Sequence, residues 1–204
     1  MKNALADRKW DKKLHIATAG MDASEAGEHR ARYEPTPYAV LERLAEGGWL
    51  TADSRVLDYG CGKGRVVIYL AARLGCRATG IDFSARMIEI AEKNRLSGPA
   101  RERTAFVRCP AEQYAVGEED AFFFFNPFSE KVLRVVLERI VRAWYARPRR
   151  MRLFFYYPSR DFIACLQADP RFAFAVEIDC RDLFWANEPR ERILVYEVDQ
   201  GRGF

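Results

Sequence analysis

The chain has little of what several classes of functional site require. Only two of its 204 residues are histidines, and its five cysteines show no C-x-x-C or other zinc-ligand spacing. No apolar run approaches the ~20 residues that a membrane span needs, and the N-terminus has no apolar signal-peptide core. The net charge of +4 is too small to indicate nucleic-acid binding by itself. We therefore expect no metal site, no membrane span and no secretory signal.

What is present is the composition of a globular protein. Apolar residues make up 49% of the chain and charged residues 30%, which is enough to build the core of one domain. The cysteines lie mostly in apolar runs, as in reduced proteins, so we expect a cytoplasmic location. The polar start predicts an N-terminal arm over 1–32, either flexible or a short helix, followed by one domain over 33–204.

Apolar periodicity divides most of the chain into alternating strands and helices. Strict alternation predicts a parallel sheet with helices on both faces. The last two strands have no helical pattern between them, so we expect them to be antiparallel. The fold class expected is α/β: a doubly wound, mostly parallel seven-stranded sheet whose last strand is antiparallel and lies at the edge. Strands are expected at 55–59, 77–82, 104–109, 121–125, 153–157, 172–179 and 193–198, and helices at 38–46, 64–74, 84–96, 130–145 and 159–168.

A glycine-rich turn follows the first strand. Residues 56–64 read Val-Leu-Asp-Tyr-Gly-Cys-Gly-Lys-Gly, and the glycines allow a tight turn and close approach of the backbone to a ligand. The next strand ends at Asp82. A carboxylate about 20 residues beyond such a turn can accept the hydroxyls of a ribose. The pattern therefore predicts a ligand that contains adenosine, although a tight turn without any ligand would need the same glycines.

The glycine spacing narrows the choice of ligand. Dinucleotide sites use G-x-G-x-x-G, where backbone amides hold a pyrophosphate. This chain has G-x-G-x-G, and the anionic Asp58 stands just before the turn. A carboxylate there suits a cationic ligand better than a pyrophosphate, which disfavours an NAD-dependent oxidoreductase.

Residues 56–64, together with Gly80-Ile81-Asp82-Phe83-Ser84, resemble the class I (Rossmann-like) methyltransferases that use S-adenosylmethionine (SAM). The resemblance implies SAM as the cofactor and S-adenosylhomocysteine (SAH) as its product. It places the ribose at Asp82 beside Phe83, and the adenine at Ala111 and Glu112. The aspartate usual after the third strand is absent, so a solvated Glu112 at a helix start is an equal alternative. The residues implied at the methionine half are Asp58, Tyr59, Gly60, Cys61, Gly62 and Gly64.

A second motif follows the apolar fourth strand. Asn126-Pro127-Phe128 resembles the Asn-Pro-Pro-aromatic motif of methyltransferases that act on planar nitrogens, with one proline in place of two. The resemblance implies that Asn126 and Pro127 orient the acceptor next to the cofactor and that Phe128 covers it. Alternatively, Asn126 caps the helix that follows.

Other candidates lie outside these motifs. The stretch Tyr33-Glu34-Pro35-Thr36-Pro37-Tyr38 is similar to one in small bacterial methyltransferases of unassigned substrate. Tyr33, Thr36 and Tyr38 are therefore candidates to close the pocket, with a rigid packed turn as the alternative. Trp185 could line the acceptor site or pack on the core. His15 and His29 could serve as a general base if the arm folds over the site, or could be exposed to solvent.

These observations predict a SAM-dependent methyltransferase that methylates a nitrogen of a small molecule, a base or a protein side chain. The alternative is an inactive SAM-binding or partner-binding module with the same fold, which a turnover assay would distinguish. The basic run at 147–152 fits a charged loop better than a phosphate contact, so nucleic acid is not favoured. The acceptor and the oligomeric state stay open.

Overall fold

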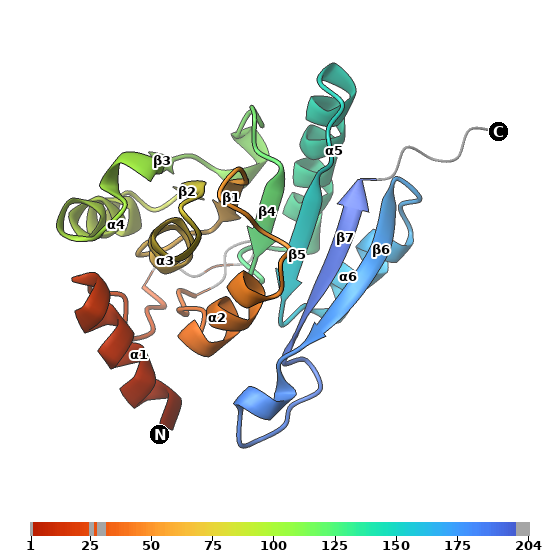
Figure 1. The fold of residues 1–204 in the computed structure, drawn as a ribbon. Coiled ribbons are helices and arrows are strands. Elements are labelled where there is room, and N and C mark those ends of the chain that lie inside the picture. The colour runs from red at the N-terminus through yellow and green to blue at the C-terminus, as the bar shows by residue number, and fades with distance from the viewer. Residues whose placement is uncertain (1, 25–26, 28–31, 199–204) are drawn as a thin grey trace.

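The computed structural model describes residues 2–24, 27 and 32–198. It shows one seven-stranded sheet between two layers of helices, as the sequence predicts (Figure 1). The strand order is β3-β2-β1-β4-β5-β7-β6. The strands are β1 (Arg55–Tyr59), β2 (Arg77–Asp82), β3 (Thr104–Arg108), β4 (Ala121–Phe124), β5 (Arg152–Tyr156), β6 (Phe172–Asp179) and β7 (Arg192–Val198).

The last strand is antiparallel, but it does not lie at the edge. β7 pairs antiparallel with both β5 and β6, so β6 is the edge strand and β7 fills the gap beside β5. Burial explains this arrangement, because β7 presents a run of four buried residues, Ile193 to Tyr196, that needs cover on both faces. β6 buries only Phe172 and is otherwise partly or fully exposed. The expectation of an antiparallel edge strand is therefore wrong in this detail.

The helices lie on both faces of the sheet because the central strands are apolar on both sides. Val56 and Phe123 pack into the core beneath α1 to α4, whereas Leu57 and Phe122 pack into the core beneath α5 and α6. The first layer contains α1 (Lys2–Leu14), α2 (Tyr38–Glu46), α3 (Arg65–Leu74) and α4 (Ala85–Ser97), and the second contains α5 (Glu130–Ala146) and α6 (Arg160–Gln167). Short 3-10 turns occupy η1 (Arg101–Arg103), η2 (Ala111–Gln113) and η3 (Arg181–Leu183).

Three strands end one residue earlier than predicted, and for two of them the backbone shows why. Asn126 and Tyr157 have φ angles of 41° and 50°. This left-handed conformation turns the chain out of the extended form directly after β4 and β5, so Phe125 and Tyr157 leave the strands. β3 likewise stops at Arg108, so Cys109 lies outside it.

The N-terminal arm contains a helix of 13 residues, α1, that packs against the domain. Trp10 stacks on Tyr38 with ring centroids 5.8 Å apart and meets Tyr69 edge-on at 5.2 Å. Asp11 and Thr18 are buried. Further along the arm, Asp22, Gly27 and Arg32 form part of the wall around the carboxyl ends of the strands, which is where the site lies.

Candidate cofactor and active site

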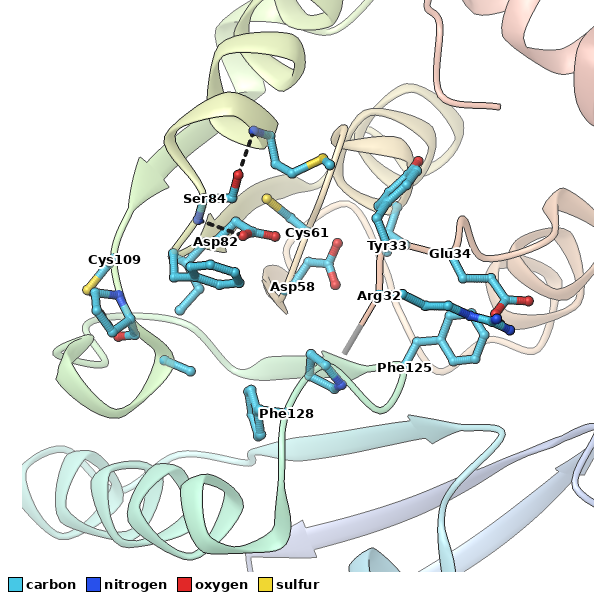
Figure 2. A pocket seen from close by; sticks show the side chains of 18 of the residues that line it. Arg32, Tyr33, Glu34, Asp58, Cys61, Asp82, Ser84, Cys109, Phe125 and Phe128 are labelled. Atoms are coloured by element: carbon cyan, nitrogen blue, oxygen red, sulfur yellow. Dashed lines mark hydrogen bonds and ion pairs between the residues drawn. The ribbon is translucent and has the colours of Figure 1, made fainter. Parts of the chain in front are cut away.

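A cavity of about 440 Å³ opens at the carboxyl ends of β1, β2 and β4 (Figure 2). The chain proceeds from β1 to β2 and β3 in one direction and from β4 to β5 in the other, so the strand order reverses between β1 and β4. Ligands of doubly wound sheets bind at such a reversal. Figure 2 shows Asp82 and Ser84 on one side of the cavity, Asp58 and Cys61 at its centre, and Arg32, Glu34 and Phe125 on the other side.

Asp82 is held at the cavity wall by backbone amides. Its carboxylate accepts hydrogen bonds from the amide of Gly62 at 3.0 Å and from the amide of Ser84 at 2.9 Å. Ser84 in turn caps α4, because its hydroxyl accepts from the amide of Met87 at 3.1 Å. The ribose-binding position expected from the sequence is thus oriented by both the glycine turn and the start of α4.

Asp58 is a buried carboxylate that lines the same cavity. Its side chain is 3% exposed, and within the described part of the chain no group donates a hydrogen bond to it. Burial, and secondarily the nearby Asp82, raises the pKa of Asp58 to about 8. An unpaired buried carboxylate is costly, and a cation beside it would remove that cost. The ammonium and sulfonium groups of SAM are such cations, so the residues present fit this cofactor.

The glycines of the turn make room for protein side chains. A Cβ on Gly60 would lie 2.4 Å from Cβ of Pro127, and one on Gly62 would lie 2.2 Å from the ring of Tyr33. Gly60 lines the cavity, but Gly62 and Gly64 do not. The role of Gly62 and Gly64 beside the methionine half of the ligand therefore stays a prediction. Gly62 lies against Tyr33, and Gly64 lies against the ring of Phe106, 2.5 Å from its own Cβ position.

The amides of the turn are also engaged by protein. Those of Gly60 and Cys61 both donate to the carbonyl of Ile81 at 2.9 Å, and that of Gly62 donates to Asp82. A pyrophosphate would need such amides directed at itself. The geometry therefore adds to the argument against a dinucleotide.

The residues expected near the adenine and the acceptor lie partly in the cavity. Phe83, Ala111 and Glu112 line it, and Pro127 and Phe128 line it as well. Tyr59 does not, because it points to the opposite face of the sheet and stacks on Phe124 at 4.9 Å.

Asn126 has a role that neither expectation included. Its Nδ2 donates to the carbonyl of Tyr157 at 2.6 Å, and its Oδ1 accepts from the amide of Ser159 at 3.0 Å. The side chain therefore joins the turn after β4 to the turn after β5 and does not line the cavity. It does not cap α5 either, since Ser129 occupies the N-cap position.

Of the four residues proposed to close the pocket or line the acceptor site, two line the cavity. Tyr33 and Thr36 line the cavity. Tyr38 does not, because it begins α2 and its hydroxyl donates to the buried Asp11 at 2.7 Å. Trp185 is 101% exposed, so it neither lines the cavity nor packs on the core.

Sequence reasoning missed Arg65, Asp11 and Thr18. Arg65 lines the cavity although its side chain is only 2% exposed, and Thr18 and Asp11 are buried beside it. One signal was available: α3 reads Arg-Val-Val-Ile-Tyr-Leu-Ala-Ala, a helix that is apolar all round and therefore buried. An arginine at the start of such a helix needs buried partners.

The remaining candidates lie apart from the cavity. His15 is exposed and does not line it, and His29 lies outside the described residues. The run at 147–152 leads into β5 at the other end of the sheet, where Arg147 pairs with Glu118 at 2.8 Å and Arg150 with Glu197 at 2.7 Å. Among the residues that the structure describes, no cluster of His, Cys, Asp and Glu could hold a metal, and no helix could cross a membrane.

Comparisons with known proteins agree with this geometry. Residues 56–145 match the family model for a methyltransferase domain. The chain is 42% identical over 74 residues to the release factor glutamine methyltransferase of Chlorobaculum tepidum, a match that covers 35% of this chain and 25% of the relative. It is 38% identical over 77 residues to a SAM-dependent Diels-Alderase of Talaromyces variabilis, covering 33% and 26%. The chain thus spans about a quarter of the length of these curated relatives.

Among solved structures, the fold is similar to an RNA methyltransferase from Salinibacter ruber in complex with SAH. The TM-score is 0.58 at 16% identity, and the alignment covers 83% of this chain and 97% of that one. The matched family model, the order of the sheet and the cavity that joins Asp58 to Asp82 lead to one conclusion: residues 56–145 belong to a methyltransferase domain, within a fold shared by solved methyltransferases that bind SAM or SAH.

Proposed function

We propose that the protein transfers the methyl group of SAM to a nitrogen atom of an acceptor that enters the cavity beside Phe125 and Phe128. The observation that carries the proposal is a single cavity lined both by Asp58 and Asp82 and by Phe125, Pro127 and Phe128. Cofactor and acceptor can therefore meet without a rearrangement of the sheet.

The chemistry asks little of the protein beyond alignment. SAM supplies a methyl carbon that its sulfonium already activates. The side chains of this chain must hold the acceptor in line and keep water out. The wall formed by Pro127 and Phe128 is well placed for this, because Pro127 packs on Gly60 and Phe128 meets Tyr59 and Phe124 edge-on at 6.3 Å.

Two observations favour nitrogen as the acceptor atom. The Asn126-Pro127-Phe128 sequence resembles the motif of enzymes that methylate planar nitrogens, and the Chlorobaculum relative is a glutamine methyltransferase by name. The side chain of Asn126 supports the motif's turn rather than the acceptor, so the positions that face the acceptor are Pro127 and Phe128.

We further propose that the acceptor is a small molecule or an exposed protein side chain. Among the described residues that line the cavity, those of the arm and of the turn at 126–129 are available to recognise an acceptor. The basic run at 147–152 is at the opposite end of the sheet and is engaged in ion pairs. A cytoplasmic location is proposed with it, supported by five free cysteines of which four are buried.

The alternative function is SAM binding without methyl transfer. It is favoured by one observation, the match to a protein named as a SAM-dependent Diels-Alderase, which covers about the same share of the chain as the match to the methyltransferase. The two functions predict the same cofactor affinity, so only turnover separates them.

The test is a methyl-transfer assay with isotopically labelled SAM and separate panels of small amines, nucleobases and peptides. We expect label in a nitrogen of one panel, and a loss of rate in Phe128→Ala. Phe174→Ala is the matched control, because Phe174 is 57% exposed on the edge strand β6 and should leave the rate unchanged. Label transferred to oxygen or carbon would contradict the proposed acceptor atom. SAH binding with no transfer to any panel would favour the alternative.

A further inference from the structure

We infer that Arg65 is a positioning residue for the cofactor: it holds Tyr33 and Thr36, in the segment directly after the arm, in place as the roof of the pocket. The inference rests on the cofactor site and not on the identity of the acceptor. Arg65 is the first residue of α3, directly after the glycine turn. Three structural observations support this role.

The first observation is how Arg65 joins the arm to the domain. Its Nε donates to Oγ1 of Thr18 at 2.7 Å, and its Nη1 donates to the carbonyl of Thr36 at 3.0 Å and to Asp7 at 2.6 Å. Its guanidinium also lies 4.3 Å from the centre of the Tyr38 ring. One buried side chain thus contacts two segments of the chain, one that contains Asp7 and Thr18 and one that contains Thr36 and Tyr38. Tyr33, which lines the cavity, lies between these segments in the sequence.

The second observation is that the guanidinium is enclosed by its partners. The Arg65 side chain is 2% exposed, and its Nη2 lies 3.7 Å from Oδ1 of Asp11, so two carboxylates flank one arginine. Asp11 is itself fixed by the amide and hydroxyl of Thr18 at 2.7 and 2.6 Å. Because Nε and Nη1 are bonded to protein groups, these two nitrogens act on a ligand through their neighbours.

The third observation is where those neighbours lead. The hydroxyl of Tyr33 donates to the carbonyl of Thr18 at 2.6 Å, so the residue that Arg65 holds also holds Tyr33. The Tyr33 ring lies against Gly62, whose amide donates to Asp82. A continuous series of contacts therefore runs from Arg65 through Thr18 and Tyr33 to the ribose-binding carboxylate.

Two more contacts fix the same part of the arm to the glycine turn. Nζ of Lys63 donates to the carbonyl of Ala19 at 3.0 Å and lies 4.6 Å from the centre of the Tyr33 ring. Asn94 of α4 bonds both the amide and the carbonyl of Ala17 and the carbonyl of Lys63. Lys63 and Asn94 therefore hold the arm independently of Arg65. Loss of Arg65 should displace Tyr33 and Thr36 without releasing the whole arm.

The experiment measures the dissociation constant of SAH for the full chain, by titration calorimetry and without any acceptor. The variants are Arg65→Lys, Tyr33→Phe, the double variant and Thr18→Val, which keeps the side-chain volume but removes the hydroxyl that Arg65 bonds. Arg73→Lys is the matched control on the same helix, because Arg73 is half-exposed and pairs with Glu46 at 3.6 Å. Thermal unfolding of each unliganded variant reports folding separately.

We expect Arg65→Lys and Thr18→Val each to weaken SAH binding by roughly tenfold, the usual effect of losing a charge-assisted hydrogen bond. Arg73→Lys should bind like the wild type. If Arg65 acts through Tyr33, the variant that combines Arg65→Lys with Tyr33→Phe should lose less SAH affinity than the product of the fold-losses in the two single variants.

Three results would overturn the inference. The first is a folded Arg65→Lys variant that binds SAH as tightly as the wild type, and the second, if Arg65→Lys does not fold, is wild-type affinity in Thr18→Val. The third is a double variant whose loss of SAH affinity equals the product of the losses in the two single variants. Absence of SAH binding in the wild type would overturn it together with the cofactor site. A failed search for an acceptor would affect only the proposed function.

Discussion

The carboxylate of Asp82 accepts a hydrogen bond from the amide of Gly62 at 3.0 Å, which ties the end of β2 to the turn after β1. Two motifs that stand apart in the sequence are therefore one structural unit. Any change at Asp82 alters the turn as well as the ribose position, and any change in the turn alters the orientation of the carboxylate. Matched control variants are needed to separate these effects.

Gly60→Ala should destabilise the fold and abolish SAH binding. Gly60 has φ of 75°, and a Cβ there would lie 2.4 Å from Pro127. Gly48→Ala is the control, because Gly48 has φ of 71° but no atom within 4 Å of the Cβ position. It should cost only the roughly 1–2 kcal/mol of a left-handed alanine and leave SAH binding intact. Equal effects in both variants, measured by chemical unfolding and calorimetry, would show that the contact with Pro127 has no importance.

SAH affinity should rise with pH up to about pH 8 and level off above it. The pKa of Asp58 is raised to about 8, so in the free protein the carboxyl is protonated below that pH. Binding of an ammonium beside it must then displace the proton, which weakens binding by up to about tenfold for each pH unit below the pKa. Calorimetry from pH 6 to 9 checks this. Asp58→Asn should bind more weakly and without this dependence, and an unchanged pH profile in that variant would assign the titration to another group.

The same pKa predicts how the unliganded protein responds to pH. The folded pKa of Asp58 lies above its ordinary value, so the folded state binds the proton more tightly than the unfolded state between about pH 4 and pH 8. The contribution of Asp58 to stability therefore falls as pH rises through this window. Asp58→Asn should lose this fall, so its melting temperature relative to the wild type should be higher at pH 9 than at pH 5. If the difference in melting temperature between Asp58→Asn and the wild type is the same at pH 5 and pH 9, Asp58 is not a buried carboxylate without a compensating partner.

Asn126→Asp should destabilise the protein more than the similar shapes suggest. The aspartate can still accept from the amide of Ser159, but it places a second oxygen against the carbonyl of Tyr157, where Nδ2 now donates. We expect a loss of roughly 1–3 kcal/mol in the free energy of unfolding, the cost of leaving a half-buried carbonyl without its donor. The control is Asn187→Asp, because Asn187 is exposed and also has a positive φ, of 47°. If chemical unfolding shows equal losses of stability in the two variants, the effect comes from backbone conformation and not from the hydrogen bonds of Asn126.

Much of the fold could be predicted because its signals are local. The apolar run of β4 and the helical period of α5 each depend on neighbours in the sequence, and both appear where expected. The position of β7 between β5 and β6 could not be predicted, because it depends on which strand needs cover on both faces.

The site shows the same division. Asp58 and Asp82 follow from the motif, since a strand end and a glycine turn bring them to one sheet edge. The role of Asn126 was missed because its two partners, Tyr157 and Ser159, lie on another turn more than 30 positions away. Arg65 was missed because its partners belong to an arm for which the sequence allowed either a helix or a flexible segment.

The most direct test of the central claim is calorimetric titration of the purified chain with SAH, with Asp82→Ala alongside. Asp82 lines the cavity at the position implied for the ribose. We therefore expect micromolar binding to the wild type, on the order of −8 kcal/mol, and clear weakening in a variant that remains folded. No binding to the wild type, or equal binding to both proteins, would contradict the assignment of this cavity to SAM.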